Sequence, residues 1–398
     1  MWPVLLVSAM ALSLVGCSSS DSGSNDAYEV AFIGPMSGPN ADLGLRPADA
    51  VEVLFDMVNA EGGVKRPDGS MVTLKLVRED SQGTPEGQTL AIRKAARNAD
   101  ALLGGMLSSP TIAGMDVAES EGIPYNIVGA ISAKIEEKIK SQEMKYVFHS
   151  APNAAARATA DMEALYELQD GRNFYIVSQD TDYGRDMVKA VEDYVKKNAD
   201  GAGVTVEYIA GGTTQYSAQL LKIKNQLPKP DVIYTVLTGQ EMFSFMDQKK
   251  TSGDTTLVYG ASSTPSSKIY IETLGADVAE GTVTNAVWAP KMSGDEGEAF
   301  AAAYDKATKR GAPADVEAQA YDGALMLINA IENAESLSRS DVAAALMTAK
   351  VDGLRGVNEF DEKTHGSPNL TFLVSQIQDG LLVPVWPKKF AEGELVTQ

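Results

Sequence analysis

The chain has 398 residues, with 34 Lys and Arg against 54 Asp and Glu, which gives a net charge of −20 at pH 7. This excess of acid argues against nucleic acid or an anionic lipid surface as a partner. The length is sufficient for two domains with ordinary hydrophobic cores, and a single Cys excludes an internal disulfide framework, so stability has to come from core packing.

The N-terminus has the pattern of an export signal. Residues 1–16 carry no charged side chain, and the apolar stretch 4–15 fits the h-region of a signal peptide but falls short of the ~20 residues that span a bilayer. Gly16 precedes Cys17, and a run of Ser, Gly and Asp follows. This pattern resembles a bacterial lipobox, which implies cleavage before Cys17, acylation of its thiol and a flexible tether over residues 17–27. The alternative is an uncleaved anchor with a spectator cysteine, because no Lys or Arg precedes the apolar stretch.

Beyond the tether, β-branched runs alternate with amphipathic helical segments. Residues 29–34 are expected to form a buried strand, and Val51, Leu54, Phe55 and Val58 then follow at spacings typical of one apolar helix face. The alternation continues with expected strands at 72–80, 101–107 and 123–128 and with expected helices at 84–98 and from Pro110. Such alternation indicates βαβ units around a parallel sheet that is covered on both faces.

A second series of the same kind starts near Tyr146. Residues 173–178 predict a strand, and a helix with Met187, Val191 and Val195 on one face follows. Further strands are expected over 204–209, 231–237 and 256–260, with helices from about Tyr216 and Gln240. Two series in tandem predict two lobes.

The remaining stretch, from Gly281 onward, is less regular. We expect one strand, helices near 298–309 and 316–333, and a terminal hairpin around Asp379 and Gly380. An Asp-Gly pair between two apolar runs is a strong hairpin signal.

The sequence lacks the signatures of the common enzyme classes. It has no GxxxxGK[ST] phosphate loop, no GxGxxG after a strand, no HExxH and no GxSxG. The two histidines, His149 and His365, lie far apart in sequence. The acidic run that contains Asp180, Asp182 and Asp186 lacks the Gly and Glu of a calcium loop, and capping of a helix by Thr181 or Asp182 explains it better. We therefore expect no catalytic residue, no metal and no cofactor.

Two loops of small residues follow neighbouring strands and predict a polar crevice. In Ser108-Ser109-Pro110-Thr111, Ser109 is a good N-cap and Pro110 suits the first helical position. Free N–H groups and two hydroxyls would then face outward at the carboxyl edge of the sheet, where open α/β sheets bind ligands and where a helix N-terminus favours a carboxylate. The loop Gly129 to Ser132 follows the next strand and lies on the same edge; the alternative is an ordinary capped helix.

Eight segments occur in an order that is similar to one protein family: AFIGPMSGPNADLG, VNAEGGV, GGMLSSPT, VGAIS, DTDYGRDM, TQYSAQL, LVYGASS and AYDGALMLINAIENA. Over nearly all of residues 28–398 the chain resembles the branched-chain amino acid binding family, the type I periplasmic binding proteins of ABC importers. The resemblance implies an α/β fold of two doubly wound parallel-sheet lobes, joined by three crossovers, with the ligand in the cleft between them. Lobe 1 would then comprise 28–149 and 286–361, and lobe 2 would comprise 150–285 and 362–398.

The resemblance also implies which residues touch the ligand from lobe 1. Ser108 and Ser109 match the hydroxyl and backbone donors that hold a ligand carboxylate, and Gly129 and Ala130 match a loop that adds backbone contacts. Ile131 stands where amino acid binders usually have Thr, so one hydrogen bond to the carboxylate is lost unless Ser132 replaces it. Leu43 stands where an aromatic residue often forms the wall of the side-chain pocket.

On lobe 2 the resemblance implies roles for Tyr183, Thr238 and Ser262. Tyr183 matches an aromatic residue that closes over the ligand, the alternative being a helix-start residue that packs on the sheet; Thr238 stands where leucine-type binders have Tyr. Ser262 stands where amino acid binders carry the acid that pairs with the ligand ammonium, and a desolvated ammonium without a counter-charge would cost several kcal/mol. Either another acid replaces it, or the ligand has no ammonium group, which we favour; the acids considered are Asp182, Glu241, Glu317 and Asp322.

The predicted protein is a lipid-anchored, exported solute-binding protein rather than an enzyme. It would capture a small carboxylate-bearing ligand, an amino acid or an aromatic or aliphatic acid, by clamshell closure. Its partner would be an ABC permease of the branched-chain amino acid type, and we expect a monomer in the periplasm or on the outer face of the cytoplasmic membrane. The alternatives are a ligand-binding sensor or receptor domain and a binder of a small amide such as a urea-type solute.

Overall fold

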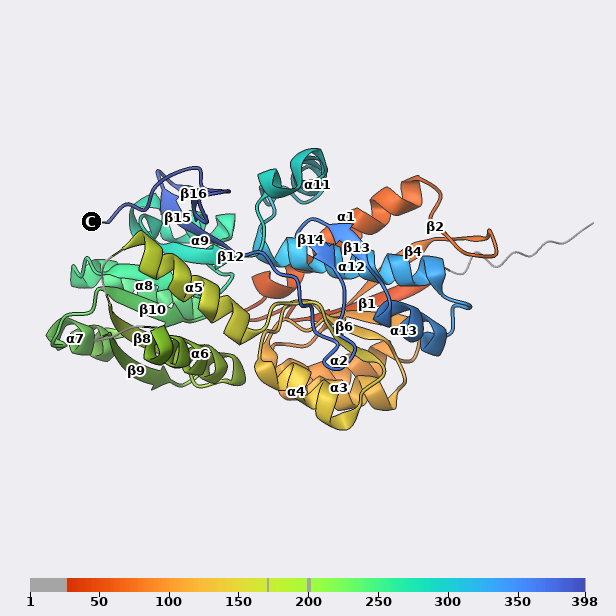
Figure 1. Cartoon of the computed structure of the whole chain (residues 1–398), viewed down its shortest axis with the longest axis horizontal. Coiled ribbons are helices and arrows are strands. Elements are labelled where there is room, and N and C mark those ends of the chain that lie inside the picture. The colour runs from red at the N-terminus through yellow and green to blue at the C-terminus, as the bar shows by residue number, and fades with distance from the viewer. Residues whose placement is uncertain (1–26, 170–171, 199–201, 398) are drawn as a thin grey trace, which may run out of the picture.

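The computed structural model describes residues 27–169, 172–198 and 202–397. Figure 1 shows these residues folded into two lobes, with lobe 1 on the right and lobe 2 on the left. The predicted signal peptide, Cys17 and nearly all of the tether lie outside the described residues. Within the described ranges, no helix combines the length and the apolar character needed to cross a membrane.

Lobe 1 contains a five-stranded parallel sheet with the order β4-β1-β5-β6-β7. The strands are β1 (Tyr28–Gly34), β4 (Leu74–Asp80), β5 (Ala101–Gly104), β6 (Tyr125–Ile127) and β7 (Val147–His149). Side chains alternate across β1: Val30 and Phe32 belong to one core cluster, and Ala31 and Ile33 belong to another. The strand is continuously apolar because both faces of the sheet are covered.

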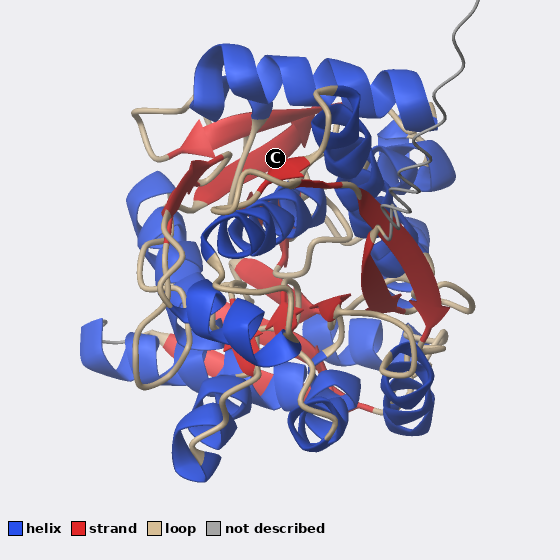
Figure 2. Cartoon of the chain, turned by 90° about the vertical axis from the view of Figure 1, so that its right-hand side faces the viewer, coloured by secondary structure: helices blue, strands red, loops and turns tan. Residues whose placement is uncertain are grey.

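Helices cover both faces of this sheet, and Figure 2 shows the helices gathered around the strands. On one face α1 (Asp42–Ala60) packs against α12 (Asp315–Asn333), and the predicted apolar face of α1 is confirmed because Val51, Leu54 and Phe55 are buried in that core. The other helices and short hairpins of lobe 1 are α2 (Pro85–Ala95), α3 (Ser108–Ser120), α4 (Ala133–Gln142), η1 (Pro290–Ser293), α11 (Gly294–Thr308), α13 (Arg339–Met347), β2 (Val64–Lys65) with β3 (Met71–Val72), and β13 (Val351–Gly353) with β14 (Gly356–Asn358).

Lobe 2 contains a seven-stranded sheet with the order β16-β15-β12-β11-β10-β8-β9, in which the pairs β12–β15 and β15–β16 are antiparallel and the other pairs are parallel. Its strands are β8 (Asn173–Gln179), β9 (Gly203–Ile209), β10 (Val232–Val236), β11 (Leu257–Gly260), β12 (Val283–Ala286), β15 (Leu373–Gln378) and β16 (Leu381–Trp386). Its helices are α5 (Ala154–Leu168), α6 (Asp182–Asn198), α7 (Ser217–Asn225), α8 (Gln240–Ser252), α9 (Lys268–Leu274) and α10 (Ala276–Ala279).

The lobes are joined where the chain leaves β7, where it leaves β12 and where it approaches β15. Residues just beyond Asp361 still contact lobe 1: the ring of His365 stacks on Phe148 with centroids 5.1 Å apart, and the N–H of Ser367 donates to the carbonyl of His149 at 3.1 Å. Residues up to 367 therefore pack on lobe 1, and the boundary near Asp361 stays a prediction.

The terminal hairpin forms as predicted. Asp379 and Gly380 connect β15 to β16 and have φ of 52° and 73°. Positive φ at both central residues is what the tight turn of a two-residue hairpin requires, and Asp followed by Gly tolerates it best.

The predicted start of α3, at Pro110, is wrong by two residues. The helix begins at Ser108, with Leu107 in an extended N-cap conformation and no side-chain cap. Ser109 is therefore not the N-cap, and Pro110 is the third helical residue. Its missing N–H costs nothing there, because the first N–H groups of a helix have no partner within the helix.

Candidate functional site

A cavity of about 350 Å³ lies between the two lobes, a size typical of sites for small molecules. It is lined at the carboxyl ends of parallel strands from both lobes, which is where open α/β sheets bind ligands. Of the ten residues predicted to bind the ligand, Ala130 and Ser132 do not line the cavity, and the following do: Leu43, Ser108, Ser109, Gly129, Ile131, Tyr183, Thr238 and Ser262.

The N-terminus of α3 contributes backbone donors to the cavity. No residue in the described ranges accepts a hydrogen bond from the N–H of Ser108 or Ser109, although both residues line the cavity. The hydroxyl oxygen of Ser108 accepts from the N–H of Ile131 at 3.3 Å and of Ser132 at 3.2 Å, and so fixes the neighbouring loop. A helix N-terminus with free N–H groups attracts an anion, and a carboxylate fits it.

Ser132 and Ala130 act inside the protein rather than at the cavity. The hydroxyl of Ser132 caps α4 by accepting from the N–H of Lys134 at 3.3 Å, and it donates to Asp186 of lobe 2. The N–H of Ala130 donates to the carbonyl of Gly105 at 2.7 Å. Ser132 therefore does not supply the hydrogen bond that Ile131 cannot make.

Lobe 2 places its predicted residues on the opposite wall. The hydroxyl of Tyr183 donates to the carbonyl of Ala261 at 2.8 Å, and burial raises the pKa of this tyrosine, so the ring faces the site as a neutral wall. Tyr183 also packs against the core of lobe 2, as the alternative interpretation expects, and its contact with a ligand stays a prediction. The hydroxyl of Ser262 donates to the carbonyl of Leu237 at 2.6 Å.

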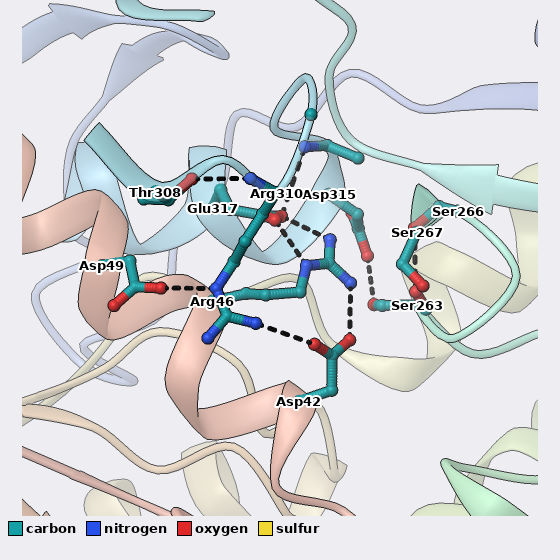
Figure 3. A network of polar contacts seen from close by, with 12 residues as sticks. Asp42, Arg46, Asp49, Ser263, Ser266, Ser267, Thr308, Arg310, Asp315 and Glu317 are labelled. Carbon is teal, nitrogen blue, oxygen red and sulfur yellow. Dashed lines mark hydrogen bonds and ion pairs between the residues drawn. The ribbon is translucent and has the colours of Figure 1, made fainter. Parts of the chain in front are cut away.

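A buried ion pair crosses between the lobes beside the cavity. Nη2 of Arg157, on α5, lies 2.8 Å from Oδ2 of Asp315, the first residue of α12. Asp315 also accepts from the hydroxyl of Ser263 (Figure 3) and from the N–H of Val287 at 2.9 Å. Burial opposes ionisation of Asp315, but Arg157 and these donors outweigh it and hold the pKa of Asp315 below its usual value. Nε of Arg157 has no partner in the described part of the chain.

Three of the four acids considered as partners of a ligand ammonium already have cations of their own. Glu317 accepts from Nε and Nη2 of Arg46 at 2.6 and 2.7 Å, as Figure 3 shows, and neither residue lines the cavity. Asp182 lies 2.5 Å from Nζ of Lys134, and Asp322 lies 2.8 Å from Nε of Arg355. Glu241 is the fourth, and it lines the cavity.

Sequence reasoning singled out neither Arg157 nor Gln179, although both line the cavity. Gln179 is the last residue of β8 and exchanges hydrogen bonds with Thr238, its Nε2 donating to Oγ1 at 3.1 Å. The position of Gln179 at the carboxyl end of a parallel strand was a usable signal. Arg157 lies within a helix, and nothing local marks it.

The acidic run at the start of α6 holds no metal-type cluster. Oγ1 of Thr181 accepts from the N–H of Gly184 at 3.1 Å, as expected for a cap, and Asp180 pairs with Arg185 at 2.6 Å. Asp186 accepts from Ser132 and from the N–H of Ala133. Among the residues that the structure describes, no group of three or more His, Cys, Asp and Glu is arranged to hold a metal ion.

The chain matches a family model and several related proteins along most of its length. The model described as periplasmic binding protein matches residues 27–380. The Leu/Ile/Val-binding protein homolog 7 of Brucella abortus (strain 2308) is 23% identical over 402 residues, covering 97% of this chain and 98% of the relative. The Leu/Ile/Val-binding protein homolog 8 of Brucella suis biovar 1 (strain 1330) is 25% identical over 413 residues, covering 96% and 98%.

Solved structures share the fold. The branched-chain amino acid transporter substrate binding protein LivJ from Streptococcus pneumoniae, in complex with isoleucine, has a TM-score of 0.78 and 19% identity, covering 90% of this chain and 98% of that one. An ABC transporter solute binding protein from R. palustris, in complex with benzoate, has a TM-score of 0.76 and 20% identity, covering 94% and 98%. At these identities the likeness shows the fold alone, so the ligand has to be argued from this chain's own residues.

Proposed function

The chain belongs to the periplasmic binding protein family, and on that basis we propose that it is the solute-binding lipoprotein of an ABC importer, which captures a small carboxylate-bearing ligand by clamshell closure. Members of this family are solute-binding proteins of ABC transporters and not enzymes, so binding and release are the activity to be explained. Relatives of the same fold were solved with isoleucine and with benzoate, which share a carboxylate.

The observation that carries the proposal is the free N-terminus of α3. The N–H groups of Ser108 and Ser109 have no acceptor in the described ranges, and both residues line the cavity. A carboxylate placed there would satisfy both donors and the positive end of the helix. Ser109 also contacts lobe 2, because its Oγ accepts from the N–H of Asp182 at 3.3 Å. The residue that would bind the carboxylate through its N–H therefore also takes part in a contact between the lobes.

Closure is supported by contacts between the lobes at the rim of the cleft. Lys134 of lobe 1 pairs with Asp182 of lobe 2, and the N–H of Gln240 donates to the carbonyl of Pro39 at 3.3 Å. A ligand that binds better when these contacts are made shifts the population toward the closed form.

The experiment that tests the site compares Ser108→Pro with Ser108→Ala. Both variants lose the hydroxyl, but only proline removes the N–H, and proline is well tolerated at the first helical position after an extended residue such as Leu107. Because a hydrogen bond to a charged group is worth about 1.5–3 kcal/mol, Ser108→Pro should bind a carboxylate ligand about tenfold or more weakly than Ser108→Ala by calorimetric titration. Equal affinities would place the carboxylate elsewhere.

Lipid anchoring rests on residues that the structure does not describe. The lipobox pattern supports acylation at Cys17, and mass spectrometry of the membrane-extracted protein tests it. A chain with Met1 still attached and an unmodified thiol would remove the anchor and leave the cleft proposal in place. An unchanged rate of solute import after deletion of the gene would favour the sensor alternative.

A further inference from the structure

Glu241 is a buried carboxylate in the wall of the cavity. Glu241 lies in the first turn of α8 and is 7% exposed. It lines the cavity together with Thr238 and Gln179. Arg157 and Glu241 are the two charged residues among the described residues of the lining. Arg157 already pairs with Asp315, whereas Glu241 forms no ion pair in the described ranges.

Two hydrogen bonds and a helix end stabilise the ionised form of Glu241, but burial outweighs them. Oε2 accepts from Nε2 of Gln179 and Oε1 accepts from the N–H of Gly212. The positive end of α8 lies beside it and also stabilises a negative charge. Burial opposes ionisation and raises the pKa of Glu241, and no Lys, Arg or His contributes to lowering it.

Asp161 is a second buried acid, and its hydrogen bonds provide a comparison for those of Glu241. Asp161 also lacks a cation in direct contact, but it accepts from three donors: the hydroxyls of Tyr234 and Tyr259 and the side-chain amide of Asn285. It is fully buried and does not line the cavity. Glu241 accepts from fewer groups and keeps free acceptor capacity on the side of the cavity.

The position of Glu241 differs from the one expected from the family resemblance. There the acid that pairs with an ammonium would stand at Ser262, whose hydroxyl is engaged with the carbonyl of Leu237 at 2.6 Å. Glu241 comes instead from α8, next to the contact of Gln240 with Pro39 of lobe 1. A positive group bound to Glu241 would therefore lie near the rim that closes.

We propose that Glu241 determines specificity by pairing with a cationic nitrogen of the ligand, an ammonium or guanidinium group, while the ligand carboxylate binds at the N-terminus of α3. The proposal rests on the proposed function and departs from the preference, based on Ser262, for a ligand without an ammonium group. A closed cleft excludes water, so a bare carboxylate there is costly, and the ligand is the group that can neutralise it.

The test uses pairs of probes that differ in one cationic nitrogen: leucine with 4-methylpentanoate, 4-aminobutyrate with butyrate, and 4-(aminomethyl)benzoate with 4-methylbenzoate. Calorimetric titration of the full chain should show that the amino member of at least one pair binds about tenfold or more tightly, and Glu241→Gln should abolish that preference. The affinity for the member without nitrogen should change little, since Gln179 can turn its amide to suit the new side chain. Glu207→Gln is the control, because Glu207 accepts from Lys222 at 2.6 Å and does not line the cavity.

Two outcomes would overturn the proposal while leaving the proposed function intact: binding of the acids without nitrogen at equal or higher affinity, and a preference for the amino member that Glu241→Gln does not alter. A panel in which nothing binds would count against the proposed function. In that case the proposal for Glu241 is tested by the stability of the ligand-free protein. Replacing an uncompensated carboxylate should leave the melting temperature at neutral pH unchanged or higher, and a clear decrease would show that Glu241 is a structural residue.

Discussion

Arg157→Met removes the cationic member of the buried ion pair between the lobes. The side chains of Arg157 and Asp315 are 4% and 0% exposed, so the variant leaves a carboxylate buried without its counter-charge. Removing one partner of such a pair typically costs about 3–5 kcal/mol. Asp315 retains the hydroxyl of Ser263 and the N–H of Val287, so we expect a loss at the lower end, about 3 kcal/mol.

The assay is equilibrium unfolding in urea, followed by tryptophan fluorescence, to which Trp288 contributes. Trp288 is 1% exposed and directly follows Val287, so its share of the signal reports on the packing around Asp315. The double variant with Asp315→Asn should lose less than the sum of the two single variants, because it leaves no buried charge behind. An exposed ion pair contributes only about 0–1 kcal/mol to the free energy of unfolding. A loss of that size for Arg157→Met would therefore refute the inference that this pair is desolvated.

Two further variants test a helix cap and the charge of Asp315. Thr84→Ala removes the cap of α2, in which Oγ1 accepts from the N–H of Gly87 at 3.0 Å, and should cost about 1 kcal/mol in urea unfolding, against no loss for the exposed Thr255→Ala. The pKa of Asp315 is lowered in the folded protein, so its contribution is present above the ordinary carboxyl pKa of about 3.9 and is lost as the pH falls through the folded value. Asp315→Asn should therefore show a shallower loss of stability than wild type on acidification, and parallel acid curves would contradict this.

Periodicity in the sequence predicts the repeated parts of this fold well. The apolar face of α1 and the buried strand β1 carry their signal in local spacing, and both lie in the core as expected. The segment from Arg339 to Asn358 was not predicted, although it forms α13 and the β13–β14 hairpin. Each of these two strands has three residues, which is too short for an alternating pattern to be recognised.

The candidate site is predictable only in part, because its ion pairs join residues that are far apart in the sequence. The loops that follow β5 and β6 could be placed at one sheet edge from strand order alone, and residues of both line the cavity. Arg157 and Asp315 are separated by 158 positions, so no local pattern links them. Glu241 was one of four acids of equal standing in the sequence, and what distinguishes it, the absence of a cationic neighbour in the described ranges, depends on how the other three acids are paired.

The proposed charges are divided between the lobes, and this division would couple recognition to closure. Lobe 1 supplies the N–H donors of Ser108 and Ser109, and lobe 2 supplies the carboxylate of Glu241. A ligand with a carboxylate alone satisfies lobe 1 in the open form but gains nothing from Glu241 when the cleft closes. A ligand that carries both charges gains its second ion pair only on closure, so its differential affinity favours the closed form. Discrimination would then arise mainly from the stability of the closed form, since a buried group left unpaired costs more than a pair contributes.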